Sequence, residues 1–128
     1  MKPELMLLVW ATLLTLVQAA VAAQGAFGQV GLVRLAGNRE GMPEITGWGG
    51  RAARAHRNML ENLVLFAVLV VAAVLADKTN GTTLLGAQIF FWARVAYAVV
   101  YIAGIPWLRT GLWAVSIAGL GMIFLQLV

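Results

Sequence analysis

Long apolar stretches separated by short polar segments run along the whole chain. No charged residue lies between Glu4 and Arg34, and three further apolar stretches follow the polar segment that begins there. A helix that crosses the ~30 Å hydrocarbon core of a bilayer needs about 20 apolar residues. The pattern therefore predicts four membrane-spanning helices, at about residues 5–33, 51–76, 84–105 and 108–128.

The polar segments between these stretches predict the connections. Residues 77–81 have the composition of a turn, and Pro106 marks the end of the third span. The segment 34–50, which is rich in glycine and holds Pro43, is the one long loop. No internal repeat is visible, and no stretch is left for a second domain. We therefore expect one all-α integral membrane domain over residues 1–128, built as a four-helix bundle.

The N-terminus is open to a second interpretation. Lys2, the apolar residues 5–17 and the small residues 19–23 resemble the three regions of a cleaved signal peptide. The apolar stretch continues well past Ala23, however, and three further spans follow it. We therefore expect the first span to be retained.

Composition agrees with a membrane protein and excludes several chemistries. The chain is 62% hydrophobic and 11% charged, whereas soluble domains are about half apolar and a quarter charged. It has no cysteine, which excludes disulfides, a thiol nucleophile and a cysteine-ligated metal. A single histidine argues against a zinc site, so we expect no metal site.

The positive charge is concentrated at one side of the predicted bundle. Arginines lie in the long loop, in the first turns of the second span and, as Arg109, between spans three and four, whereas the opposite side carries only Lys2 and Lys78. The positive-inside rule places the long loop in the cytoplasm and both termini outside. The short termini favour a bacterial inner membrane. We interpret the arginines as a topology signal and expect no nucleic-acid partner.

Two polar faces lie within the second and third spans. Arg51, Arg54, Asn58 and Glu61 follow a 3-4-3 spacing, which places them within an arc of about 80° on a helix. On the third span, the spacing of Arg94, Tyr97 and Tyr101 gives an arc of about 60°. Ionisable groups inside a membrane usually face a bundle interior or a cavity. The two faces therefore predict a polar cleft that opens to the cytoplasm.

Depth along the two spans suggests a specific contact in this cleft. At ~1.5 Å per residue, Glu61 lies roughly 15 Å below Arg51, and Arg94 lies roughly 16 Å from the cytoplasmic end of the third span. We therefore predict that Glu61 and Arg94 pair near the midplane. The cleft would suit a small molecule with carboxylates, amides and an amine.

Structural interpretations of the same residues stay open. The arginines at the start of the second span could extend to the surface and bind lipid phosphate, which we favour for Arg57 because it points off the shared face. A Glu61–Arg94 pair could be purely structural. His56 lies about 140° from the polar arc and is better explained as a helix contact.

The residues that carry these features resemble a known family. The run Arg-x-x-Arg-Ala-His-Arg-Asn-x-x-Glu over residues 51–61 resembles the signature of the MAPEG family, the membrane-associated proteins in eicosanoid and glutathione metabolism. Tyr101-Ile-Ala-Gly104, with Arg94 before it and Arg109-Thr110 after it, is also similar to the family. The resemblance covers nearly the whole chain.

The resemblance implies a left-handed four-helix bundle that forms a homotrimer. Glutathione, as co-substrate, would lie between neighbouring subunits, and a lipophilic small molecule or lipid would enter from the bilayer. Arg109 and Thr110 resemble a pair that stabilises the thiolate in some members, so they are the candidate catalytic residues. The candidate glutathione-binding residues are Arg51, Arg54, Arg57, Asn58, Glu61, Arg94, Tyr97 and Tyr101.

The chain also departs from the family pattern. Gly50 stands where microsomal members often have Glu, and Gly31 replaces a basic residue that can follow Gly28-Gln29-Val30, with Arg34 as a candidate substitute. The leading hypothesis is a glutathione-dependent transferase or peroxidase. The departures favour an alternative, a non-enzymatic membrane protein that binds a lipid or a small anionic ligand. A transporter or channel is a weaker alternative, because the chain lacks the inverted repeats and broken helices that are usual in transporters.

Overall fold

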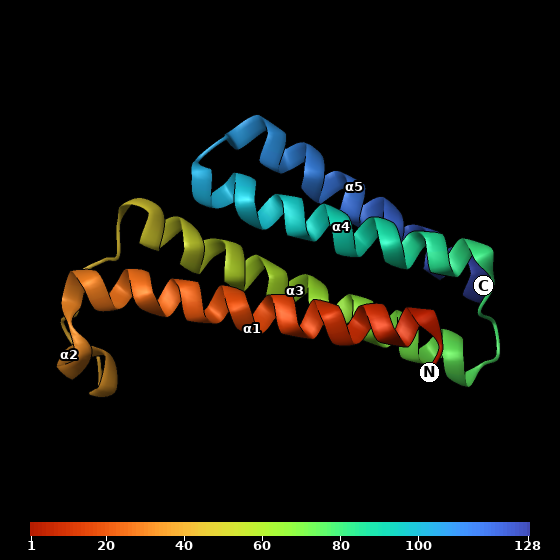
Figure 1. Ribbon diagram of the computed structural model, residues 1–128, viewed down its shortest axis with the longest axis horizontal. Helices are drawn as coiled ribbons and strands as arrows, with labels where there is room; N and C mark the ends of the chain where they lie inside the picture. Colours follow the sequence, from red (N-terminus) through yellow and green to blue (C-terminus); the bar gives the residue numbers. More distant parts are fainter.

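The computed structural model describes residues 1–128, and all of its regular structure is helical. Four long helices lie side by side, with both chain termini at one end and the short helix α2 (Leu32–Ala36) at the other (Figure 1). Each long helix is long and apolar enough to cross a membrane. The predicted all-α membrane architecture with four spans is therefore confirmed. The long helices are α1 (Pro3–Val30), α3 (Gly47–Leu75), α4 (Gly81–Ala103) and α5 (Pro106–Leu127).

The helix boundaries differ from the predicted ones by one to four residues, for local reasons. α1 stops at Val30 because Gly31 has φ 81°, a backbone conformation that ends a helix and that glycine adopts easily. The sequence pattern did not predict α2, which follows directly. α4 begins at Gly81 because Asn80 and Thr83 form a reciprocal capping box, and it ends at the left-handed Gly104.

The helices pack as two close pairs, α1 with α3 and α4 with α5. Glycines allow the close approach within each pair. A Cβ on Gly86 would lie 2.7 Å from the carbonyl oxygen of Gly119, and a Cβ on Gly25 would lie 2.6 Å from the Cα of Gly49. Small residues at helix contacts are the usual way for membrane helices to pack tightly.

Between the pairs, the core is built from apolar side chains. The rings of Phe66 on α3 and Phe90 on α4 stack with centroids 4.2 Å apart, and Met59 and Ile123 are fully buried around them. Only 26 of the 128 residues are buried, and large apolar side chains such as Val64 remain exposed. This distribution suits a bundle whose outer surface faces lipid.

Polar contacts close the end that carries both termini. The buried carboxylate of Glu4 accepts a 2.7 Å hydrogen bond from the Thr83 hydroxyl and so joins α1 to α4. Lys78 Nζ donates to the carbonyl oxygen of Leu127 at 3.1 Å, and the amide of Asn80 donates to Gln126 at 2.9 Å. These bonds fix the relative height of the helices at this end.

At the opposite end, Gln29 holds the long loop against α1. Its Nε2 donates to the Thr46 carbonyl oxygen at 2.7 Å, and its Oε1 accepts from the Thr46 backbone N–H at 2.9 Å. Thr46 is the residue that precedes α3. The amide of Gln29 therefore fixes the start of the helix that carries half of the predicted site residues.

Candidate functional site

Two adjoining hollows lie between α3, α4 and α5, and together they form what we call the polar cleft. They share Asn58 and Tyr97, which places them side by side. The first has a volume of about 380 Å³ and is lined by Arg54, Arg57, Asn58, Glu61, Tyr97 and Tyr101. The second has a volume of about 220 Å³ and is lined by Asn58, Tyr97, Arg109, Thr110 and Trp113.

Helical spacing on three elements brings these side chains together. Arg54, Asn58 and Glu61 come from successive turns of α3, and Tyr97 and Tyr101 come from successive turns of α4. Arg109 and Thr110 are in the first turns of α5, which α4 reaches through the tight turn at Gly104. The polar faces expected on the second and third spans therefore line one cleft.

Arg94 lies beneath the cleft and is almost completely buried, at 1% exposure. Its Nη2 donates a 2.7 Å hydrogen bond to Asn58 Oδ1, and its guanidinium lies 4.1 Å from the centroid of the Tyr97 ring. Its Nε and Nη1 have no hydrogen-bond partner within the chain. Buried donors without partners are costly, and a buried charge is more so. The cleft therefore has a positive charge beneath it with unused hydrogen-bonding capacity.

The predicted ion pair between Glu61 and Arg94 is absent from the chain. Asn58 supplies the only acceptor that Arg94 uses, and the carboxylate of Glu61 is exposed at the cleft rim. The reason is helix geometry: the buried face of α3 at this depth runs through Met59 and Asn62, so Glu61 is turned outward. Asn62 donates to Asn58 Oδ1 as well, at 3.1 Å, and holds that amide in place.

Arg109 stands at the mouth of the second hollow. Its guanidinium lies 4.5 Å from the centroid of the Tyr101 ring, a cation–π contact that holds the charge beside α4. The hydroxyl of Thr110 donates to the Pro106 carbonyl oxygen at 3.2 Å. The two candidate catalytic residues thus line the same hollow as Asn58 and Tyr97.

Other sequence-predicted residues lie outside the cleft. Arg51 Nε donates to the Ile102 carbonyl oxygen at 2.9 Å and lies against Gly104, so it ties α3 to the end of α4. His56 is half-buried on α3 and lines neither hollow. Arg34 is on α2 and lines a separate hollow, so it does not line the polar cleft of its own chain.

The two departures from the family pattern have structural reasons. Gly31 is the left-handed junction between α1 and α2. At Gly50 a Cβ would clash with the Ile45 carbonyl oxygen, so the long loop packs where a side chain would be. Any larger residue at position 50 would displace this loop.

Sequence reasoning missed Trp113. It follows Arg109 by four residues on α5, so the two share a helix face, and its indole forms part of the second hollow. That i, i+4 spacing was the available signal. The structure has no group of three His, Cys, Asp or Glu side chains that could hold a metal ion.

No curated protein and no solved structure gives a match to the chain. The family model described as MAPEG family matches residues 5–128, nearly the whole chain. This family includes glutathione transferases and peroxidases together with members of other function. The chain, an integral membrane protein of four spans, belongs to the MAPEG family.

Proposed function

We propose that the protein is a membrane-bound, glutathione-dependent transferase or peroxidase that acts on a lipophilic electrophile. The observation that carries this proposal is Arg94, a buried cation with two unpartnered guanidinium nitrogens in contact with two residues that line the polar cleft. An anionic ligand in the cleft would be attracted by this buried positive charge, which lies directly behind Asn58 and Tyr97.

Glutathione matches the side chains of the first hollow group by group. It carries two carboxylates, two amides and one ammonium at neutral pH. Arg54 and Arg57 present forked donors for carboxylates at the rim, and Asn58 can read an amide. Glu61, whose carboxylate is exposed and free of Arg94, is available to accept the ammonium.

The second hollow suits the thiol chemistry. A free thiol has a pKa of about 8.5, and a nearby cation lowers it, so Arg109 would raise the thiolate population at neutral pH. Thr110 lines the same hollow beside it. The thiolate would attack the electrophile, forming a C–S bond while the displaced group leaves with the electron pair. The protein needs no nucleophile of its own, which agrees with a chain without cysteine.

We further propose that the active form is a homotrimer in the bacterial inner membrane, with the long loop in the cytoplasm. The two hollows are open, and their volumes of about 380 and 220 Å³ lie near and below the lower limit of typical ligand pockets, which are ~300–1,000 Å³. A neighbouring subunit would close the cleft around a bound tripeptide. Glutathione would enter from the aqueous side, and the electrophile would enter from the lipid.

Thermal stability across a glutathione titration tests this proposal. Saturable stabilisation of the detergent-solubilised protein is expected, because a ligand that binds only the folded state raises its stability. Arg54→Ala and Glu61→Gln should reduce the shift, whereas Arg34→Ala, which removes an arginine outside the cleft, should keep it. No shift at millimolar glutathione in the folded protein would overturn the proposal.

A specific observation favours the alternative of a non-enzymatic lipid or anion binder. Arg54 and Arg57 are exposed at the arginine-rich end, where lipid phosphates would be in reach. The two functions separate in one assay. An enzyme conjugates glutathione to an apolar electrophile such as a chlorodinitrobenzene, whereas a binder shows a thermal shift without turnover.

A further inference from the structure

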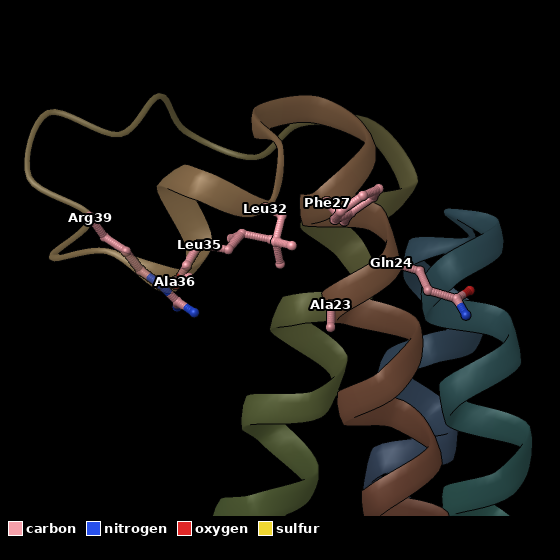
Figure 2. A pocket seen from close by; sticks show the side chains of 7 residues that line it. All are labelled: Ala23, Gln24, Phe27, Leu32, Leu35, Ala36 and Arg39. Carbon is pink, nitrogen blue, oxygen red and sulfur yellow. Dashed lines mark hydrogen bonds between the residues drawn. The ribbon is translucent and has the colours of Figure 1, made fainter.

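A further hollow, separate from the polar cleft, lies at the arginine-rich end of the bundle. It has a volume of about 490 Å³ and lies between the last turns of α1 and α2; we call it the interfacial groove. Figure 2 shows Leu32 and Leu35 extending from α2 toward α1, with the Arg39 side chain running back beneath Ala36. None of its residues lines the polar cleft. The lining residues are Ala23, Gln24, Phe27, Leu32, Leu35, Ala36 and Arg39.

The length of α1 places this groove at the level of lipid headgroups. α1 has 28 residues, or roughly 42 Å at ~1.5 Å per residue, whereas the hydrocarbon core is ~30 Å thick. Counted from Leu5, where the apolar run begins, a span of about 20 residues ends at Gln24. The groove therefore lies at the boundary between hydrocarbon and headgroups, with Ala23 and Gln24 at its inner side.

The groove combines an apolar wall with a fixed cation. Phe27 and Leu32 are more than half exposed, which is unfavourable for apolar side chains in water and favourable beside an acyl chain. Arg39 lies in the left-handed region, φ 62°, and its Nε donates to the Leu35 carbonyl oxygen at 2.9 Å. That bond holds the guanidinium at the groove and leaves its two terminal nitrogens for a ligand.

The surrounding charge points to an anionic occupant. Arg34 and Glu40 line an adjoining hollow together with Arg39, so two cations face one anion and the local charge is positive. Arginine binds phosphate oxygens in forked geometry. We propose that the interfacial groove is an anionic phospholipid site. The phosphate would bind Arg39, and the first carbons of an acyl chain would pack against Phe27, Leu32 and Leu35.

Native mass spectrometry of the purified protein tests this site, because it reports bound lipids and oligomer mass together. The probes are phosphatidylglycerol and phosphatidylcholine with identical acyl chains. Arg39→Asn removes the cation without straining the backbone, since Asn adopts the left-handed region readily. Lys2→Gln removes the same charge at the opposite end of the bundle. Ala36→Trp fills the groove while leaving the charge unchanged.

The expected results follow from the two parts of the groove. The unmodified protein should bind phosphatidylglycerol more tightly than phosphatidylcholine, and Arg39→Asn should weaken phosphatidylglycerol binding about fivefold, the usual effect of one basic residue near a lipid surface. Lys2→Gln should change nothing, and Ala36→Trp should displace one bound lipid per chain. Equal binding of the two lipids, or equal effects of Arg39→Asn and Lys2→Gln, would overturn the proposal. A change of oligomer mass in Ala36→Trp would overturn it in favour of a second copy covering the groove.

Discussion

Buried polar groups have hydrogen-bond partners within the chain at one end of the bundle, but not in the region toward the other end. At the end with both termini, the buried carboxylate of Glu4 has its partner in Thr83, and Lys78 and Asn80 are also bonded within the chain. In the interior, toward the arginine-rich end, Arg94 is buried with two nitrogens unpartnered. The polar side chains at the end with both termini need no ligand as a partner, so their hydrogen bonds contribute to the stability of the fold. The half toward the arginine-rich end keeps hydrogen-bonding capacity that no residue of the chain uses.

The largest effect is expected at Arg109, which lines the hollow proposed for the thiol. Arg109→Ala should lower kcat/KM for conjugation about 100-fold, in the range seen when a preorganised anion stabiliser is removed. The glutathione-induced thermal shift should persist, because the other binding side chains remain. Steady-state kinetics and thermal titration on the same preparation check both parts. Unchanged kcat/KM would show that Arg109 has no role in the chemistry.

Arg94→Met tests the contrast directly by replacing the buried cation with an apolar side chain of similar length. Glutathione affinity should fall about tenfold or more, since hydrogen bonds to charged groups contribute about 1.5–3 kcal/mol. The ligand-free protein should be as stable as before or more stable, because the chain itself does not compensate the burial of this charge. Thermal unfolding with and without glutathione measures both quantities. A strong loss of ligand-free stability would mean that Arg94 is structural.

Thr83→Val, at the end with both termini, should lower the stability of the ligand-free protein without changing its affinity for glutathione. It leaves the buried carboxylate of Glu4 without its donor, which should cost about 1–3 kcal/mol of stability. Glutathione affinity should be unchanged, because the contact lies at the far end of the bundle (Figure 1). Denaturant unfolding in detergent and the thermal titration report the two values. Serine at the same position keeps the hydroxyl and is the matched control.

The smallest effect is expected for Gln29→Ala at the loop. Losing its two hydrogen bonds to Thr46 should lower stability by about 1 kcal/mol, since these bonds are exposed to solvent. Hydrogen exchange at residues 40–46 should increase, while exchange in α4 and α5 should not. Equal protection of the loop in both proteins would show that Gln29 does not hold it.

Much of the architecture could be predicted from the sequence, because membrane-spanning helices are recognised by their length and apolarity. The four spans were predicted, and so was the family, through the run at residues 51–61. α2 was not predicted, since five residues after a glycine give no periodic signal. The junction depends on the left-handed backbone of Gly31, which sequence alone leaves open.

Within the site, the depth of each residue along its helix could be predicted from the sequence, but its contact partners could not. Helical rise placed Glu61 and Arg94 at similar levels. The long side chain of Arg94 can reach acceptors over more than one turn, however, and the acceptor that faces it is Asn58. Arg51 shares the polar spacing, yet its Nε is taken by the Ile102 carbonyl oxygen. Such choices depend on the rotation of each helix against its neighbour, which no periodicity within a single helix encodes.

The near-contact between Gly86 and Gly119 also bears on how the cleft can open. With no side chain between their backbones, α4 and α5 are locked as one rigid hairpin. α3, by contrast, packs only sparsely against α5. If the cleft widens, we therefore expect the seam between α3 and α5, which Asn58 and Trp113 border, to part before the seam between α4 and α5.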